Sequence, residues 1–427
     1  MTATAVPNSW HRAPGPSCRA AACRAFQHVS EARGFLPERD PLQRLPGPEF
    51  APWEEALEQL PKFAVAAGQG ELRAWLRSLP PFPAAALLPP RQGPCGGTEI
   101  AAASNGSGRG DGSTEELWRA YMLLSFLAHG YMWCDGPAPP RTLPAVLAGP
   151  WCAVAAALHM PPVLTYSTYN LLNWRRLDPA GPVALGNTAC LSNFLGGIDE
   201  EWFRLVHVQI EQLAAPAIAA LPAGQRAAAV GDAAGVAAVL EAISAALVAM
   251  QATLARMGEK CDPHIYYHRV RLPMSGWRGN PALPDGLVYE GQFGGQPQQF
   301  YGETGAQSSI VPALDAALGI RHDRCSWLAA YLADQRAHMP PAHRAFLASL
   351  EAGPSLRVVA EAGPPALRAA YNECVHQLER FRSQHRGFAS AYIAVPGRKA
   401  DEKGTGGSDF MPALTSYRDA TARHMLS

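Results

Sequence analysis

A stripe of apolar residues near the C-terminus limits what this chain can fold into more than any other feature. Its members recur at steps of three or four residues, which is the spacing of one face of an α-helix. The stripe consists of Leu367, Tyr371, Cys374, Leu378, Phe381, His385 and Phe388. The opposite face carries polar and charged side chains, namely Glu373, His376, Glu379, Arg380 and Ser383. We therefore predict a long amphipathic helix, with His385 on its packed side and His376 in water.

His385 occupies a position where a core residue belongs. A buried imidazole needs a partner, because an unpaired buried polar group costs roughly 1–3 kcal/mol. One candidate partner is a backbone carbonyl, as for a structural histidine in a protein core. The other is a bound iron, for which imidazole is a common ligand. Helical spacing alone favours the carbonyl and leaves both open.

The composition is that of a large globular protein with a neutral charge balance. The chain has 427 residues and formal net charge +0, with 48% hydrophobic and 17% charged residues. This length and apolar content are enough for a large buried core and for two domains. A neutral chain gives no electrostatic reason to bind nucleic acid or an anionic membrane, so we expect neither partner.

The nine cysteines are odd in number and scattered, and no C-x-x-C pair occurs among them. Neither a zinc site nor a disulfide framework is therefore indicated. A reducing compartment fits this cysteine usage, and we expect a cytoplasmic protein. The longest uncharged run, residues 142–174, is interrupted by four prolines, which indicates buried core segments rather than a membrane span.

Residues 1–30 are rich in Pro, Ala and Arg and are predicted to form a disordered tail. Arg12, Arg19 and Arg24 come before any acidic residue, a feature shared with organelle transit peptides. Of the two interpretations, an untargeted tail is the favoured one.

Helical periodicity dominates the rest of the chain. Ser113 and Glu116 form a capping-box pattern that predicts the start of a helix. Stripes typical of a helical bundle occur at residues 203–214 and 236–254. Further helices are expected at residues 53–63, 71–79, 144–159, 163–174 and 310–318. Strand signals are few: residues 266–272 alternate weakly, and residues 287–289 offer a short pairing. The predicted fold is mostly α, with minor short β pairings.

Three spaced blocks resemble the indoleamine 2,3-dioxygenase family, in the family's order. The first is Ser275-Gly276-Trp277-Arg278-Gly279-Asn280-Pro281 followed by Asp285-Gly286-Leu287-Val288-Tyr289-Glu290-Gly291. The second is Gly305-Ala306-Gln307-Ser308-Ser309. The third is Arg382-Ser383-Gln384-His385, then Tyr392-Ile393-Ala394-Val395-Pro396-Gly397, then Lys403-Gly404-Thr405-Gly406-Gly407-Ser408-Asp409. The similarity runs from about Arg33 to the end of the chain.

The resemblance implies a helical protein that holds haem b between two domains. Residues 31–180 would form a small helical domain covering the distal side of the haem, and residues 181–427 a large helical haem-binding domain. His385 matches the proximal iron ligand, and Arg382 matches an arginine near a haem propionate. A surface arginine is the plain alternative for Arg382.

The resemblance also implies a propionate-binding role for Thr304, next to Gly305, whose small size lets backbone approach the porphyrin. This chain reads Glu303-Thr304-Gly305-Ala306 where mammalian relatives have Gly-Ser-Ala-Gly. Without the resemblance, the stretch indicates only the start of a helix.

The implied substrates are L-tryptophan and O2. Arg271 matches the arginine that binds the amino acid carboxylate, and Arg269 is its rival if the stretch is extended. Thr405 and Gly404 match a glycine-rich lid over the same end of the substrate.

An aromatic slot for the indole is implied by Tyr166, Phe203 and Tyr266. Tyr266 and Tyr267 stand where mammalian relatives have phenylalanine, and Arg204 also replaces a phenylalanine. Taken singly, each aromatic residue is more typical of a core than of a ligand pocket.

His207 is a further departure, since mammalian relatives have serine there and the related tryptophan 2,3-dioxygenases place a histidine over the distal haem face. We hypothesise that His207 takes part in catalysis by hydrogen bonding to the indole N–H or to an oxygen intermediate. A buried structural histidine is the competing interpretation.

The reaction implied is insertion of O2 across the indole C2–C3 bond to give N-formylkynurenine, the first step of the kynurenine pathway. It would use ferrous haem reduced by an external electron donor, in a protein that we expect to be monomeric. The alternatives are a haem enzyme of the same fold acting on another indole, and a haem protein that binds or senses a gas. A non-haem iron site is a weaker alternative, because His322-Asp323 is adjacent and indicates a turn.

Overall fold

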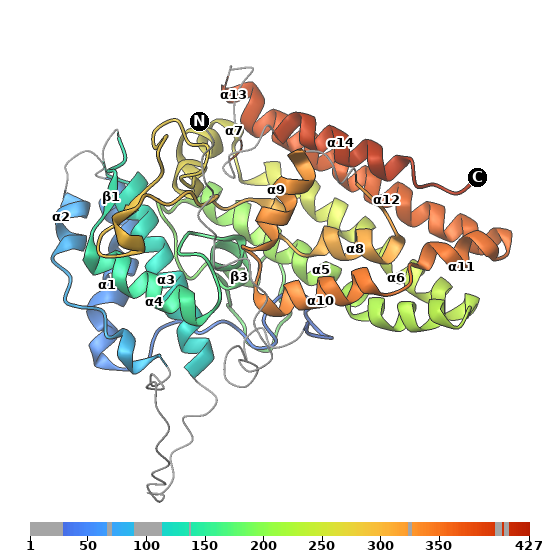
Figure 1. The fold of residues 1–427 in the computed structure, drawn as a ribbon, viewed down its shortest axis with the longest axis horizontal. Helices are drawn as coiled ribbons and strands as arrows, with labels where there is room; N and C mark the ends of the chain where they lie inside the picture. The colour runs from blue at the N-terminus through green and yellow to red at the C-terminus, as the bar shows by residue number, and fades with distance from the viewer. Residues whose placement is uncertain are drawn as a thin grey trace, which may run out of the picture.

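The computed structural model describes residues 29–65, 71–88, 113–135, 138–322, 327–397, 404 and 410–427. Figure 1 shows an elongated, almost wholly helical molecule, which confirms the predicted mostly-α fold. Its first helices are α1 (Ala51–Val65), α2 (Glu71–Arg77), α3 (Ser113–Trp133), α4 (Ala145–Ala157), α5 (Ile198–Ala229) and α6 (Ala233–Ala255). Later helices are α7 (Pro263–Ile265), α8 (Ile310–Leu318), α9 (Trp327–Arg336), α10 (Pro341–Ala352), α11 (Leu356–Ala362), α12 (Pro365–Ala389), α13 (Val395–Gly397) and α14 (Phe410–Ala422).

Helix α3 is the centre of the N-terminal half. Nearly all its side chains from Leu117 onward are buried, and α1, α2 and α4 pack around it (Figure 1). A helix with apolar side chains on every face is stable only when other elements cover all its faces, so α3 forms the core of the N-terminal half. The predicted helix start falls at Ser113, whose side chain lies outside the described residues.

Helices α5, α6 and α12 pack side by side in the C-terminal half, with α14 on the far side of α12 (Figure 1). The predicted stripe of α6 is buried at Val236, Leu240, Ile243 and Leu247. With the turn that follows it, this helix (Ala233–Glu259) is long and apolar enough to cross a membrane. Its buried stripe packs on α5 and α12, which accounts for that composition.

The C-terminal stripe lies on α12 as predicted. Leu367, Tyr371, Cys374 and Leu378 are buried, and His376 is exposed on the opposite face. His385 continues the stripe, but its side chain is accessible rather than packed. The prediction of a tightly packed imidazole was therefore wrong at this position.

The described residues contain two short pairs of β-strands. Strand β1 (Thr142–Leu143) pairs in parallel with β4 (Val288–Tyr289), with Thr142 opposite Val288. Strand β2 (Arg175–Arg176) pairs antiparallel with β3 (Thr188–Ala189), with Arg175 opposite Ala189. The pairing expected at residues 287–289 is confirmed.

The weak strand predicted at residues 266–272 was wrong. Tyr266–Val270 is a π-helical turn closed by a 2.9 Å hydrogen bond from Arg271 N to Tyr266 O, and a 3₁₀ turn follows at Leu272–Met274. Asp262 begins this helical stretch by accepting from His264 N and Ile265 N, an N-cap that outweighs a faint alternation. Because the segment is helical, Arg269 is exposed while Arg271 is half-buried, so the two arginines do not share a side.

The helix predicted at residues 163–174 is reduced to one π-helical turn, Ser167–Leu171. The hydroxyl of Thr168 explains this, because it bonds twice to the backbone of Thr165. Thr165 N donates to Thr168 Oγ1 at 3.1 Å, and Thr168 Oγ1 donates to Thr165 O at 3.0 Å. Such local side-chain bonds compete with regular helical bonding.

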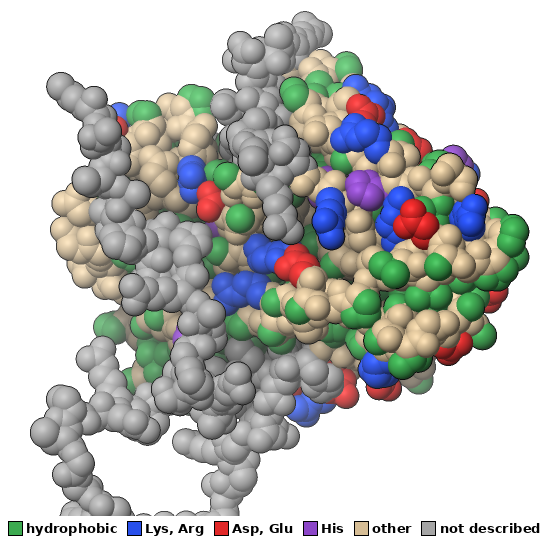
Figure 2. Space-filling view, turned by 45° about the vertical axis from the view of Figure 1, so that its right-hand side comes forward, with side chains coloured by type: hydrophobic (Ala, Val, Ile, Leu, Met, Phe, Trp, Pro, Cys, Tyr) green, Lys and Arg blue, Asp and Glu red, His purple; other side chains and the backbone are tan. Residues whose placement is uncertain are grey.

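Figure 2 shows charged side chains of both signs scattered over the helical end of the molecule. On the described part of that face they form no broad patch of a single sign, in keeping with the neutral net charge. The division of the chain at about residue 180 stays a prediction.

Glu54 and Arg119 form a buried ion pair between α1 and α3, with side chains 1% and 4% exposed and a shortest N–O distance of 2.5 Å. Glu54→Ala leaves a buried guanidinium without its counter-charge, and we expect a loss of roughly 3–5 kcal/mol in the free energy of unfolding. Urea denaturation measures this loss. The matched control is Asp285→Ala, which breaks an exposed pair with Arg141 and should cost less than about 1 kcal/mol. Equal losses in both variants would contradict the expectation.

Candidate active site

The imidazole of His385, on the last turn of α12, is available as a ligand. It is accessible and makes no hydrogen bond to any described residue. Its surroundings are nevertheless protein rather than bulk water, since burial, and after it the nearby His207, lower the pKa of His385 to about 4. At neutral pH the ring is uncharged and presents a nitrogen lone pair.

His207, on α5, is the group close enough to influence His385 electrostatically. Its Nδ1 lies 2.7 Å from the backbone oxygen of Phe203. A carbonyl only accepts, so Nδ1 carries the proton and donates, and Nε2 keeps its lone pair. Burial lowers the pKa of His207, so the ring is neutral and Nε2 is a hydrogen-bond acceptor.

Aromatic rings gather around His207. The ring centre of Phe203 lies 4.6 Å from that of His207 and 4.8 Å from that of Tyr266, and Tyr166 lies 6.1 Å from His207. The structure thus brings together the three predicted indole-lining residues and the predicted catalytic histidine. They come from the position just before the π-helical turn η5 (Ser167–Leu171), from α5, and from the π-helical turn η7 (Tyr266–Val270). We call Tyr166, Phe203, His207 and Tyr266 the aromatic slot.

Next to the slot, the block at residues 303–309 borders open space. Gly305 is exposed, and a Cβ atom added there would meet nothing within 4 Å. Thr304 Oγ1 accepts a 3.4 Å hydrogen bond from Ala306 N. Gln307 ties this block to the slot, since it accepts from Tyr166 N at 2.8 Å and donates to Gly302 O at 2.8 Å. A flat ligand could therefore approach the backbone at Gly305.

Comparison with known proteins agrees with this geometry. A family model described as "Indoleamine 2,3-dioxygenase" matches residues 23–91 and 111–424. Indoleamine 2,3-dioxygenase 1 of Rattus norvegicus is 36% identical over 418 residues, which cover 94% of this chain and 95% of that protein. Indoleamine 2,3-dioxygenase 2 of Homo sapiens is 33% identical over 416 residues, covering 93% and 94%. The indoleamine 2,3-dioxygenase of Saccharomyces cerevisiae is 30% identical over 446 residues, covering 92% and 91%.

The chain belongs to the indoleamine 2,3-dioxygenase family. It is an oxidoreductase of the dioxygenase class. The features already described fit the haem that this family implies: an accessible, neutral His385, a hydroxyl at Thr304 and open backbone at Gly305. Among the described residues, no group of three or more His, Cys, Asp or Glu side chains could hold a metal ion. The Nε2 atom of His322, considered above for a non-haem iron site, lies 2.8 Å from Asp315 Oδ2.

Arg382 is held by protein groups one turn before His385. Its Nη2 donates to Asp315 Oδ2 at 2.6 Å, and Nη1 donates to Thr421 Oγ1 and to Tyr417 O. Burial by itself would raise the pKa of Asp315, but Arg382 and His322 outweigh it and lower that pKa. A propionate contact at Arg382 stays a prediction, and it would be shared with Asp315.

Arg271 lies half-buried at the end of η7, with its guanidinium 5.3 Å from the ring centre of Tyr267. His129 supports this turn from α3: its Nδ1 lies 2.7 Å from Pro273 O, and its Nε2 accepts from Leu164 N at 3.0 Å. One buried imidazole therefore joins the turn after Arg271 to the segment before Tyr166. Of the predicted lid, Gly404 is half-buried and Thr405 lies outside the described residues.

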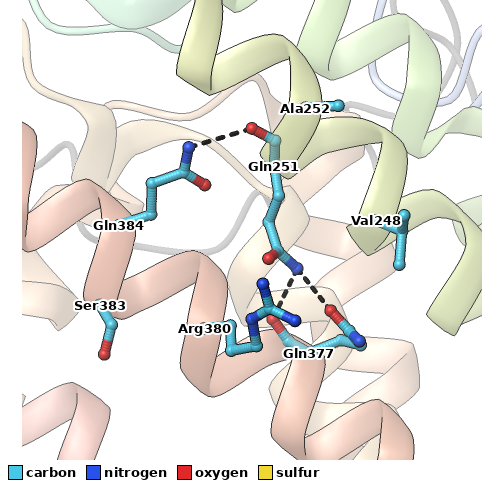
Figure 3. Close-up of a pocket in the computed structure, with 7 residues that line it drawn as sticks. All are labelled: Val248, Gln251, Ala252, Gln377, Arg380, Ser383 and Gln384. Atoms are coloured by element: carbon cyan, nitrogen blue, oxygen red, sulfur yellow. Dashed lines mark hydrogen bonds between the residues drawn. The ribbon is translucent and has the colours of Figure 1, made fainter.

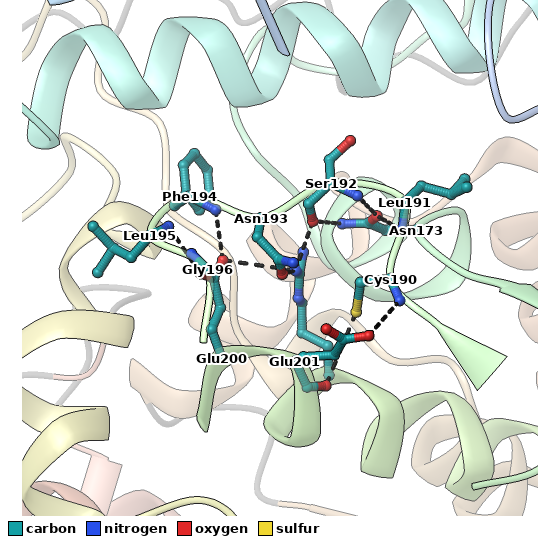
Figure 4. A network of polar contacts seen from close by, with 11 residues as sticks. Asn173, Cys190, Leu191, Ser192, Asn193, Phe194, Leu195, Gly196, Glu200 and Glu201 are labelled. Atoms are coloured by element: carbon teal, nitrogen blue, oxygen red, sulfur yellow. Dashed lines mark hydrogen bonds and ion pairs between the residues drawn. The ribbon is translucent and has the colours of Figure 1, made fainter. Parts of the chain in front are cut away.

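Arg204 lies on the buried side of α5, next to the network of Ser192 and Glu200 that Figure 4 shows. Its Nη2 donates to Ser192 O at 2.6 Å and lies 3.6 Å from Glu200 Oε1. Glu200 also accepts from the backbone N–H groups of Phe194, Leu195 and Gly196. Arg204 is therefore an interior residue next to the slot, at the position where it replaces a phenylalanine of mammalian relatives.

A hollow of about 490 Å³ between α6 and α12 lies on the water-facing side of α12 (Figure 3). It is lined by Val248, Gln251, Ala252, Gln377, Arg380, Ser383 and Gln384. Its amides pair with one another: Gln251 Nε2 donates to Gln377 Oε1 at 2.8 Å, and Gln384 Nε2 donates to Gln251 O at 3.0 Å. The hollow is a structural seam between helices, away from the aromatic slot.

Sequence patterns did not reveal Glu211, which follows His207 by one turn of α5. It is 1% exposed and accepts from Ser308 Oγ at 2.7 Å. Burial raises the pKa of Glu211 to about 7, although Ser308 and the nearby Tyr166 act in the opposite direction. A spacing pattern could not reveal this residue, because Ser308 is 97 positions away.

Glu211→Gln tests this carboxyl group. A raised pKa means that the folded protein disfavours the charged form, so the wild type loses stability as pH rises from the ordinary value of 4.5 through about 7. We expect Glu211→Gln to be more stable than the wild type at pH 8 by up to roughly 3 kcal/mol, and to show no such gain near pH 4. Urea unfolding across this pH range measures the difference. The control is Glu241→Gln, at an exposed position on α6, and a pH-independent difference for Glu211→Gln would contradict the expectation.

Proposed function

We propose that this protein inserts both atoms of O2 across the indole C2–C3 bond of L-tryptophan and releases N-formylkynurenine. The observation that carries the proposal is the aromatic slot around His207, together with the accessible imidazole of His385 close to it. Membership of the indoleamine 2,3-dioxygenase family supports it along nearly the whole chain. Neither alternative, a gas sensor or an enzyme for another indole, is favoured by the relatives.

The proposed cofactor is haem b in the ferrous state. His385 would hold the iron, with Thr304, Gly305 and Arg382 on the propionate side. The bound haem supplies the oxygen chemistry. An external electron donor would keep the iron reduced.

The protein's own contribution is orientation in a site shielded from water. The guanidinium of Arg271 would pair with the substrate carboxylate, because a planar fork of N–H donors matches two carboxylate oxygens. The lid residues Gly404 and Thr405 would close over the same end. Tyr166, Phe203 and Tyr266 would enclose the indole, which fixes its C2–C3 bond relative to the cofactor.

His207 would accept a hydrogen bond from the indole N–H at Nε2, the nitrogen that the Phe203 carbonyl leaves available. Because the pKa of His207 is lowered by burial, its ring stays neutral and keeps this lone pair. No described residue has to remove a proton if oxygen adds directly to the indole. A cytoplasmic, monomeric protein with a small domain at residues 31–180 completes the proposal.

Turnover of L-tryptophan by the reduced, haem-loaded protein in air tests the function, with N-formylkynurenine followed by its absorbance. We expect product from the wild type, and a loss of both haem absorbance and product formation in His385→Ala, by about a hundredfold or more, since even second-sphere changes cost 10–100-fold. The control is His376→Ala, on the exposed face of the same helix, which should behave like the wild type. If the wild type shows an intact haem spectrum but forms no product, the proposed function is wrong and the proposed cofactor still stands.

His207→Ala tests the role of the distal histidine. We expect retained haem and a drop in kcat/KM of roughly 5- to 150-fold, the range for losing a hydrogen bond of 1–3 kcal/mol. Binding of 1-methyl-L-tryptophan, which lacks the N–H, should be weakened much less than binding of L-tryptophan. Kinetics like those of the wild type, or equal weakening of both ligands, would show that His207 is only structural.

A further inference from the structure

Four polar side chains are buried together behind the aromatic slot. Tyr169 and Arg204 are 0% exposed, Asn170 is 1% exposed and Glu303 is 4% exposed. Asn170 Nδ2 donates to Glu303 Oε1 at 3.0 Å, and the guanidinium carbon of Arg204 lies 4.7 Å from the ring centre of Tyr169. These residues come from η5, from α5 and from the position just before Thr304. We call them the polar cluster.

Several atoms of the polar cluster have no hydrogen-bond partner among the described residues, although they are shielded from water. They are Tyr169 Oη, Asn170 Oδ1, and Arg204 Nε and Nη1. Buried polar groups are nearly always paired, because an unpaired one destabilises the fold. Several such atoms at one place, on three neighbouring side chains, indicate that a polar group from outside the chain completes them.

Other buried tyrosines show how unusual the hydroxyl of Tyr169 is. Tyr121, Tyr289 and Tyr371 are likewise fully buried, and each donates to a backbone carbonyl at 2.6 to 2.8 Å. Tyr169 is held as firmly by its ring, between Arg204 and the stacked rings of Phe126 and Phe194. Packing therefore fixes the ring of Tyr169, while its hydroxyl remains available to a hydrogen-bonding group of a ligand.

The polar cluster borders the slot on the side of Tyr166 and Phe203. Arg204 directly follows Phe203 on α5, and Glu303 directly precedes Thr304 in the block that Gln307 ties to Tyr166. Arg271, the predicted carboxylate ligand, lies instead at the end of the turn Tyr266–Val270. Asn170 follows Tyr166 by about one turn of the π-helical segment, which puts both residues on one side of it.

We propose that the polar cluster binds a hydroxyl group on the benzene ring of the substrate, so that the preferred substrate is a ring-hydroxylated tryptophan. This inference rests on the proposed function. With the carboxylate at Arg271, the benzene edge of the indole would point toward the Tyr166 and Phe203 side of the slot, which the cluster borders. A hydroxyl both donates and accepts, so it would donate to Asn170 Oδ1 and accept from Tyr169 Oη–H or an Arg204 N–H. A ring C–H can do neither and leaves these atoms unpaired.

The test compares binding and turnover of L-tryptophan, its 5-, 6- and 7-hydroxy derivatives, and 5-methyl-L-tryptophan by the haem-loaded full chain. Calorimetry gives the affinities, and absorbance gives kcat/KM. We expect at least one hydroxy derivative to exceed L-tryptophan in both by roughly fivefold or more, the size of one added hydrogen bond. The methyl derivative should show no such gain. No gain for any hydroxy derivative, or an equal gain for the methyl derivative, overturns the proposal.

Tyr169→Phe locates the effect. This substitution removes one hydroxyl and no hydrogen bond seen in the structure, so the unfolding temperature of the ligand-free protein should not fall. The preference for the hydroxy derivative over L-tryptophan should shrink roughly five- to tenfold. Tyr371→Phe, which loses a hydroxyl bonded to Leu318 O far from the slot, should leave that preference unchanged.

Two outcomes of the Tyr169→Phe experiment count against the proposal: a preference that does not change, and an unfolding temperature that drops by several degrees, which would mean that the hydroxyl is already paired. Failure of the proposed function is a separate result. If no tryptophan gives product, the dioxygenase reaction is wrong, while the affinities still decide whether the cluster recognises a ring hydroxyl.

Discussion

The buried ion pair between Arg382 and Asp315 holds the site together. It joins α12, which carries His385, to α8, and α8 packs in turn against α5, which carries His207. Thr421 of α14 bonds to the same guanidinium and fixes α12 from its other side. Removing one partner of such a pair typically costs roughly 3–5 kcal/mol. The two imidazoles stand on separate helices, so their relative position depends on this ion pair and on α6, which packs against both α5 and α12.

Long, strongly periodic segments were predictable from the sequence, and short polar ones were not. Helix α12 and the buried stripe of α6 follow directly from apolar spacing, since tertiary packing only had to accept faces that the sequence already defined. The strand prediction for residues 266–272 was wrong because a weak alternation of apolar residues was given more weight than the helix N-cap at Asp262. The prediction that His385 is packed was wrong for a different reason. Helical spacing shows which side of a helix faces inward, but it does not show whether that side contacts other side chains or open space.

The candidate site shows a similar division. Motifs brought Tyr166, Phe203, His207 and Tyr266 to notice, and the structure assembles them. The residues that support them could not be found this way. Asp315 looks like an ordinary helical carboxylate until Arg382, 67 positions later, is seen to lie on it. His129 likewise gains its meaning only from Pro273, 144 positions away. Such partners are created by the fold, so a sequence read locally holds no signal for them.

The π-helical turns next to the site have a consequence for how this protein can change over time. Among the described residues they occur at Ser167–Leu171, Tyr266–Val270 and Ser390–Ala394. The first follows Tyr166, the second contains Tyr266, and the ring of Tyr392 in the third lies 5.6 Å from that of Tyr266. A π turn amounts to one extra residue in an α-helix, so losing that residue would rotate everything beyond it by about 100°. Side chains here can be exchanged one for one, but the count of residues is fixed. Diversification of this pocket is thus confined to substitution, while insertions and deletions are left to the surface loops.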